Sequence, residues 1–262
     1  MSSVPKSATT ALALFSPPYD HLTACGHDAI SDMGGVDSWK GRAIVWLLND
    51  RPDQMANFEA LRYKPMGLPL IVLLPPPGQI RSVLEMLPLV RNLTPRMILP
   101  HGLVDTPYRL RQILASPPRS IPVTLTDYLV GRGLLRTKKA AREFQRIVEL
   151  APETRSISAL SRRMYTSRRT LGRHLISTGM PVPSHCLHFA RLFHVALQLQ
   201  TDDAAVFRIA SRLGYADGFT MSNQMKRLIG YRPSEVRRLL GWEWIVEAWL
   251  KKEGLSPEDS GS

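Results

Sequence analysis

The second half of the chain repeats itself at an offset of 50 residues, without a gap. Six positions are identical between the two copies: Ser161 and Ser211, Arg162 and Arg212, Tyr165 and Tyr215, Thr170 and Thr220, Pro183 and Pro233, Ser184 and Ser234. Three further positions are apolar in both copies: Ile157 and Phe207, Leu171 and Met221, Leu175 and Met225. So many matches at one spacing indicate an internal repeat, in which each copy is one supersecondary unit.

Each copy predicts two helices joined by a tight turn. The first helices cover residues 157–164 and 204–213, and the turns cover residues 165–166 and 214–216. Ser167 and Asp217 follow the turns, where a helix N-cap accepts hydrogen bonds from free backbone N–H groups. In each second helix two apolar residues at i and i+4 face the first helix, which leaves a polar outer face. This arrangement predicts a helix-turn-helix, whose second helix enters a major groove.

Positive charge is concentrated in the same region. The chain has 34 Lys and Arg against 22 Asp and Glu, a net charge of +12. Residues 155–238 carry 14 basic and 4 acidic side chains, or +10, whereas residues 1–131 carry 12 and 10, or +2. A basic module beside a nearly neutral one is typical of binding to a phosphate backbone. A solubilising surface is the alternative that charge alone leaves open.

This region resembles the DNA-binding domain of the AraC/XylS family. The strongest likeness is in Arg208-Ile-Ala-Ser-Arg-Leu-Gly-Tyr-Ala-Asp-Gly-Phe-Thr-Met-Ser-Asn-Gln-Met-Lys-Arg and in Gly230-Tyr-Arg-Pro-Ser-Glu-Val-Arg237. Both segments follow the family signature IA…GF…F…FK…G.SP..YR. The first copy, Thr166-Ser-Arg-Arg-Thr-Leu-Gly-Arg-His-Leu, follows the pattern S.R.L.R.F. The resemblance covers residues 155–238, about a third of the chain.

The resemblance implies two helix-turn-helix units joined by a rigid helix over residues 183–199. The second helices then hold the residues that we expect to contact DNA: Arg168, Arg169, Thr170, Gly172, Arg173, Gly218, Phe219, Thr220, Ser222, Asn223, Lys226 and Arg227. Arg is suited to guanine and Asn to adenine, while Phe can contact a thymine methyl group. The chain departs from the family pattern at Leu160, Asn223, Arg232 and Val236, so the family's base contacts do not transfer to these positions.

The first half predicts an α/β domain that does not resemble the β-barrel sensor of most relatives. Strand-like segments cover residues 12–15, 43–48, 69–74, 97–99 and 121–125, and helical segments cover residues 20–32, 53–63, 78–92 and 106–115. This alternation predicts a parallel sheet with helices on both faces. Five such units resemble the flavodoxin-like, receiver-type fold.

The residues that phosphorylation of a receiver requires are missing from this half. Ser16 and two prolines follow the first strand instead of acidic residues, Leu74 stands in place of an acceptor Asp, and Thr126 stands in place of a Lys. Pro76-Pro77-Gly78 is no phosphate loop, because proline lacks the N–H donor. We therefore expect a domain that is not phosphorylated and serves as a sensor or a protein-docking module.

Other constellations have simpler explanations than a catalytic or metal site. Asp50 and Asp53 suit loop solvation or helix capping as well as an acidic pair. His185, Cys186, His188 and His194 share the joining helix but lack a fourth converging metal ligand. Trp242, Ile245 and Trp249 form a stripe typical of core packing. The alternative function, an enzyme with a flavodoxin-like catalytic domain targeted to DNA, lacks a recognisable catalytic set.

Four segments follow from these patterns: a receiver-like domain over residues 1–127, a basic connector helix over 128–154, the AraC-type domain over 155–250, and a tail over 251–262. Two cysteines and no long apolar run predict a soluble, cytoplasmic protein without a membrane partner. The expected partner is double-stranded DNA, with RNA polymerase and a second copy of the chain as candidate protein partners. No cofactor is expected. Transcription regulation is the predicted function.

Overall fold

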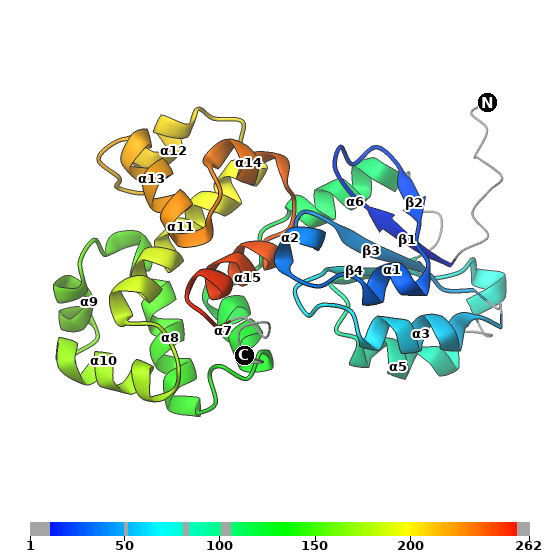
Figure 1. The fold of residues 1–262 in the computed structure, drawn as a ribbon, viewed down its shortest axis with the longest axis horizontal. Coiled ribbons are helices and arrows are strands. Elements are labelled where there is room, and N and C mark those ends of the chain that lie inside the picture. Colours follow the sequence, from blue (N-terminus) through cyan, green and yellow to red (C-terminus); the bar gives the residue numbers. More distant parts are fainter. Residues whose placement is uncertain (1–10, 50–51, 81–83, 101–105, 256–262) are drawn as a thin grey trace. The chain divides into compact units, whose positions relative to one another are not determined.

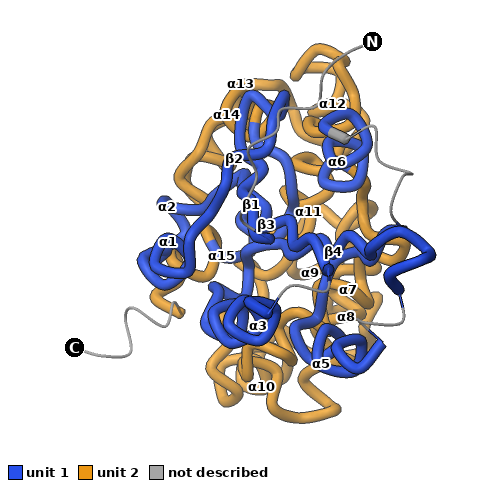
Figure 2. The backbone as a smooth tube through the Cα atoms, turned by 90° about the vertical axis from the view of Figure 1, so that its right-hand side faces the viewer, with its two compact units in different colours: residues 1–115, 239–247 blue, residues 116–238, 248–262 orange. Residues whose placement is uncertain are grey.

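The computed structural model describes residues 11–49, 52–80, 84–100 and 106–255. The chain forms two compact units, each of which is discontinuous in sequence. Unit 1 comprises residues 1–115 and 239–247, and unit 2 comprises residues 116–238 and 248–262. Figure 2 shows the two units in different colours. The predicted division at residue 127 assigned residues 116–127 to the sheet domain, whereas they lie in unit 2.

Unit 1 is built on a five-stranded mixed sheet with the strand order β2-β1-β3-β4-β5. Its strands are β1 (Leu12–Phe15), β2 (Leu22–Ala24), β3 (Ala43–Leu47), β4 (Leu70–Leu73) and β5 (Met97–Leu99). Strands β3, β4 and β5 are parallel, and β1 is antiparallel to both β2 and β3. Buried apolar side chains fill β3 and β4, as is usual for strands covered on both faces.

Helices lie on both faces of this sheet (Figure 1). They are α1 (His27–Ser31), α2 (Val36–Trp39), α3 (Gln54–Arg62), α5 (Leu87–Asn92) and α6 (Thr106–Ala115), with short 3-10 turns at Pro77–Gln79 and Leu84–Met86. Leu110 and Leu114 of α6 pack with Phe15, Val45 and Ile71 in one buried cluster. On the opposite face the Trp46 indole donates a hydrogen bond to Gln54 of α3 over 3.0 Å. Successive side chains of a strand point to opposite faces of the sheet, so the strands contribute to a core on each side of it.

Residues 239–247, which come from the far end of the chain, complete unit 1. The Tyr19 hydroxyl donates to the Gly41 carbonyl oxygen over 2.6 Å and accepts from the Leu240 backbone N–H over 2.7 Å. Leu240 joins the buried cluster that contains Phe15 and Tyr19. Burial raises the pKa of Tyr19 to about 12, so its hydroxyl keeps its proton and both hydrogen bonds at neutral pH.

The predicted α/β class with helices on both faces of the sheet is confirmed, but the sheet is mixed, whereas a parallel sheet was predicted. Residues 20–32, which were expected to be helical, contain β2, because the Tyr19 N–H binds the Ser16 carbonyl in a turn that folds β2 back onto β1. The expected fifth strand at 121–125 lies in helix α7 (Ile121–Gly131). Pro122 suits the first turn of a helix, and Thr126 donates to its carbonyl oxygen over 2.7 Å.

Unit 2 is all-α, as predicted. Besides α7 it contains α8 (Lys138–Leu150), a 3-10 turn (Ala151–Glu153), α9 (Ile157–Arg163), α10 (Arg168–Ser177), α11 (Pro183–Thr201), α12 (Val206–Arg212), α13 (Gly218–Ile229) and α14 (Pro233–Arg238), while α15 (Glu243–Lys252) contributes its later residues. Helix α11 contacts α8, α9, α10, α12, α13 and α14. Its buried side chains, among them Phe189 and Phe193, therefore form the core around which both helix pairs pack.

The predicted stripe of Trp242, Ile245 and Trp249, which begins one residue before α15, is buried, in agreement with the predicted core role. Trp242 lies in unit 1, and Trp249 lies in unit 2 and is completely buried. The Trp249 ring stacks on Phe189 of α11, with ring centroids 4.0 Å apart and planes 5° apart. Within the described ranges, no helix is both long and apolar enough to cross a bilayer.

Candidate DNA-binding surface

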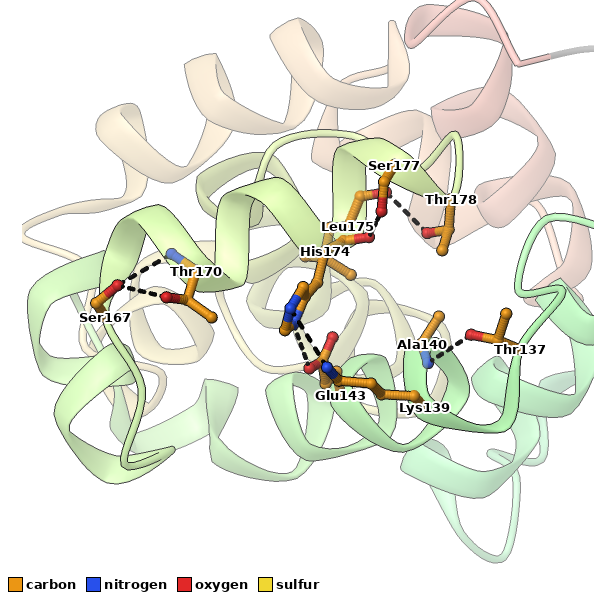
Figure 3. A network of polar contacts seen from close by, with 10 residues as sticks. All are labelled: Thr137, Lys139, Ala140, Glu143, Ser167, Thr170, His174, Leu175, Ser177 and Thr178. Atoms are coloured by element: carbon orange, nitrogen blue, oxygen red, sulfur yellow. Dashed lines mark hydrogen bonds and ion pairs between the residues drawn. The ribbon is translucent and has the colours of Figure 1, made fainter.

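Both second helices begin at the N-caps that the sequence predicts. The Ser167 hydroxyl accepts from the Thr170 backbone N–H over 3.0 Å at the start of α10 (Figure 3). Asp217 does the same for Thr220 over 2.6 Å at the start of α13. This backbone hydrogen bond is the main reason why the pKa of Asp217 is lowered. The two caps fix where each helix starts and thus which side chains reach its outer face.

The turns before these helices also match the prediction, with one residue more in the second copy. Tyr165 takes a left-handed conformation at φ 51°, and Gly214 takes one at φ 70°. Gly accepts this conformation without strain, whereas Tyr rarely adopts it. Tyr165 is 97% exposed, so its side chain projects from the turn into solvent.

The apolar sides of α10 and α13 are buried, which fixes their outward faces. Leu171 and Leu175 of α10 and Met221 and Met225 of α13 are at most 1% exposed. The opposite faces carry exposed cations: Arg168, Arg169 and Arg173 on α10, and Lys226 and Arg227 on α13. Among the residues that the structure describes, none of these five cations pairs with a carboxylate. Each helix therefore presents uncompensated positive charge, which suits a polyanion.

Uncharged side chains accompany the cations on these faces. On α13, Asn223 and Thr220 are exposed, Ser222 is half-buried and Phe219 is 76% exposed. Thr170 of α10 is half-buried, and its hydroxyl lies 2.8 Å from that of Ser167 (Figure 3). An amide, hydroxyls and an exposed aromatic ring can contact the edges of bases. That they do so stays a prediction.

The two glycines among the predicted DNA contacts lie against neighbouring helices. A Cβ on Gly172 would lie 3.9 Å from Pro183 Cδ, at the start of α11. A Cβ on Gly218 would lie 3.5 Å from the Phe207 Cα of α12. These neighbours support a packing role for both glycines, and their contact with DNA stays a prediction.

Helix α10 is held against α8 by a polar network (Figure 3). His174 Nδ1 lies 2.9 Å from Glu143 Oε1, and His174 Nε2 lies 3.3 Å from Lys139 Nζ. Glu143 and Lys139 both belong to α8, which lies within the basic connector predicted as one helix over residues 128–154; in the structure the end of α7 and α8 share that range. His174 follows Arg173 directly, so this network adds a polar contact to the apolar packing that already orients α10 and Arg173.

The second turn is held differently, by Arg191 of α11. The Arg191 Nη2 donates to the Leu213 carbonyl oxygen over 2.9 Å and to the Gly214 carbonyl oxygen over 3.4 Å. Its guanidinium carbon lies 4.8 Å from the centre of the Tyr215 ring, a cation–π contact. Arg191 is only 7% exposed. It therefore binds the turn before α13 and does not belong to the outer face.

Two exposed aromatic residues near this surface were not among the predicted contacts. Tyr165 is 97% exposed in the first turn, and Phe207 is 63% exposed at the start of α12. The repeat pairs Tyr165 with Tyr215 and Phe207 with Ile157. Their exposure depends on tertiary packing and on the turn conformation, which the pattern of residues does not encode.

The remaining candidate clusters do not converge on a site. His185 Nδ1 pairs with Glu253 Oε2 at 3.0 Å, and Cys186 is fully buried. Asp53 Oδ1 accepts a hydrogen bond from its neighbour Gln54, and Asp50 lies outside the described residues. Within the described part of the chain, no group of three His, Cys, Asp or Glu side chains is placed to hold a metal ion.

Comparison with known proteins agrees with the geometry of unit 2. A family model for a helix-turn-helix domain, of the AraC type, matches residues 160–239. The matched range contains α10 to α14 and most of α9. No curated protein matches the chain. The match indicates a DNA-binding transcription regulator of the AraC type.

Proposed function

We propose that this chain is a sequence-specific regulator in which α10 and α13 read successive segments of the major groove. The observation that carries the proposal is the presence of two N-capped helices, each with a buried apolar side and an outer face whose cations pair with no carboxylate in the described part of the chain. Recognition helices on one chain address groove segments about one helical turn apart, or roughly 34 Å.

Four side chains are assigned to base contacts in this proposal. Arg169 and Arg173, one turn apart on α10, contact guanine, because guanidinium binds two guanine acceptors at once. Asn223 of α13 contacts adenine, and Phe219 contacts a thymine methyl group. Arg227 contacts phosphate. All four base-contacting side chains are exposed, which supports the assignment.

Selection from a randomised duplex library tests the assignment. Arg173→Ala should weaken binding to the preferred site by about 1–3 kcal/mol and relax one base position. Asn223→Ala should relax a different position, about 10 base pairs away. Arg227→Ala should lower the affinity for all DNA sequences equally. Arg91→Ala, an exposed arginine of unit 1, is the control and should leave the preferred site unchanged. If Arg173→Ala and Asn223→Ala relax the same base position, or if neither relaxes any position, readout by two helices is contradicted.

Unit 1 serves in this proposal as a sensor or docking module that works without phosphorylation. Strand β4 ends at Leu73, and Leu74 and Pro75 follow it where a receiver has its acceptor Asp. Incubation with acetyl phosphate and magnesium should therefore leave the intact mass unchanged. A stoichiometric phosphoryl adduct on unit 1 would contradict this role. RNA polymerase and a second copy of the chain are the proposed protein partners, which co-purification and light scattering can test.

A further inference from the structure

Unit 1 contains a cavity of about 580 Å³ between α3 and α5. Its apolar walls are formed by Phe58, Leu61, Leu89 and Leu93, and two cationic side chains, Arg62 and Lys64, also line it. Asn92 and Thr94 add polar groups on the α5 side. This volume lies within the range of small-molecule sites, which are mostly apolar with a few polar groups that fix the ligand's orientation.

Among the residues that the structure describes, Lys64 is the cation of this cavity that forms no ion pair with a carboxylate. Its Nζ donates to the carbonyl oxygens of Leu68 over 3.0 Å and Pro65 over 3.5 Å. Burial lowers the pKa of Lys64 to about 8, and the charge of Glu243 only partly opposes this. Glu243 itself accepts two hydrogen bonds from Arg96. An ammonium group has three N–H donors, so one remains for a ligand.

Arg62 adds a second, more exposed positive charge at the same cavity. Its guanidinium pairs with Glu59 at 3.0 Å, and both side chains are about half exposed. An exposed ion pair of this kind contributes little to the stability of the fold, so a ligand can replace Glu59 as the partner of Arg62 at little cost. A carboxylate ligand near Lys64 would therefore meet one half-buried cation held by neutral carbonyl oxygens and one more exposed cation, Arg62.

We propose that this cavity binds a small organic carboxylate with an apolar body, with the acid group at Lys64 and the body against Leu61, Leu89 and Leu93. This inference rests on the proposed sensor role of unit 1 and gives that role a ligand class. Charge complementarity selects the anion, because Arg62 and Lys64 line the cavity and none of the described residues on its walls is a carboxylate, while Glu59 pairs with Arg62 and Glu243 pairs with Arg96. The apolar walls select against a small hydrophilic acid.

The protonation of Lys64 makes the binding dependent on pH. Lys64 is charged below about pH 8 and becomes neutral above it. A bound carboxylate favours the ammonium form, so binding raises the pKa of Lys64 and takes up protons near pH 8. Carboxylate affinity should fall as the pH rises from 8, at most tenfold per pH unit. The affinity of a neutral amide of the same shape should not fall in this way.

A fragment screen on the full chain tests the proposal. The library consists of matched triplets, such as 4-phenylbutyrate, its neutral amide and 4-phenylbutylamine, and binding is detected by ligand-observed NMR. Carboxylates should be enriched among the hits. Hits spread evenly over the three charge types, or enriched in amines, would overturn the proposal.

Four variants locate the site. Lys64→Gln should weaken carboxylate binding at least about tenfold, because it removes a charge-assisted hydrogen bond. Leu89→Trp should also weaken it, because it fills the cavity without changing the charge. Lys64→Arg should retain most of the affinity, and Arg91→Gln, an exposed charge on α5 outside the cavity, should leave it unchanged. If Lys64→Gln and Leu89→Trp both bind the carboxylate with wild-type affinity, the proposed location of the site is wrong. If Lys64→Gln unfolds, the pH dependence of the wild type decides instead.

DNA binding separates this inference from the proposed function. Lys64→Gln without ligand should bind DNA as the wild type does, because Lys64 lies in unit 1. Carboxylate binding that leaves DNA affinity unchanged would support the site and overturn the sensor role. If the wild-type chain binds DNA but binds no carboxylate at the cavity, only the inference drawn from the cavity is overturned.

Discussion

Arg96 and Glu243, which are 147 residues apart in the sequence, form a mostly buried ion pair inside unit 1. Arg96 Nη1 donates to both carboxylate oxygens, over 2.7 and 2.8 Å. The Nη2 of the same guanidinium donates to the carbonyl oxygens of Ile113 and Leu114, over 3.1 and 3.0 Å. The side chains are 13% and 9% exposed. One arginine thus connects the end of α6 to the start of α15.

Breaking this pair should destabilise the protein. Glu243→Gln leaves the Arg96 charge without its counterion, and breaking a buried pair costs about 3–5 kcal/mol. Because the pair retains some exposure, we expect about 3 kcal/mol or less. Urea unfolding followed by tryptophan fluorescence measures the loss. Glu59→Gln, which breaks the exposed pair with Arg62, is the matched control and should change the stability by less than about 1 kcal/mol.

Tyr19 should make the protein sensitive to alkaline pH. Its pKa is about 12 in the folded state and near 10 in the unfolded state, because burial disfavours the phenolate. The contribution of the neutral hydroxyl is therefore complete below pH 10 and is lost as the pH rises towards 12. Tyr19→Phe should lower stability at neutral pH by about 1–3 kcal/mol, because Gly41 and Leu240 lose a partner.

The difference between the wild type and Tyr19→Phe should narrow above pH 10. Chemical unfolding at several pH values gives this comparison. Tyr63→Phe serves as the control, since Tyr63 is 74% exposed. A difference that stays constant between pH 9 and 11.5 would contradict the assigned role of the Tyr19 hydroxyl.

DNA binding should weaken steeply as salt concentration rises. The slope of log affinity against log salt should be about −0.9 for each phosphate neutralised, and several of the five outer-face cations should contribute. Fluorescence anisotropy of a labelled duplex gives the slope. Lys226→Ala should reduce its magnitude by about one unit if Lys226 contacts phosphate. A response independent of salt would rule out binding to the phosphate backbone through these faces.

Loosening α10 from α8 should affect the first helix pair alone. Glu143→Gln removes the acceptor charge that binds His174, so α10 keeps its apolar packing and Arg173 but is held less firmly in its rotation. We expect relaxed base preference in the half-site bound by α10 and unchanged preference in the half-site bound by α13. Parallel library selection measures both. Glu149→Gln, on the same helix but paired with Arg146, is the matched control.

The helix pairs could be predicted from the sequence because their signals are local. Ser167, Asp217 and the apolar pairs at i and i+4 specify caps and buried sides within a few residues of each other. The sheet was harder, because a short apolar run such as 121–125 suits a strand or a buried helix equally well. The turn at Ser16 and Tyr19, which reverses β1 into β2, contains prolines that also suit a helix start.

The cavity of unit 1 could not be predicted, for a different reason. Arg62 and Lys64 look like ordinary solvated charges near the end of an amphipathic helix. Only the burial of the Lys64 ammonium group and its hydrogen bond to the Leu68 carbonyl oxygen distinguish Lys64 from such solvated charges. Such features arise from packing between segments that are distant in sequence, and no spacing of residue types encodes them.

The discontinuity of unit 1 has a consequence for synthesis on the ribosome. Residues 239–247 leave the exit tunnel only after the whole of 116–238, so Arg96 and Tyr19 wait for their partners through that time. The sheet therefore completes its fold after the helical region has emerged. A fragment that ends before residue 239 should expose the apolar surface that Leu240 covers, and should bind chaperones more strongly than the full chain.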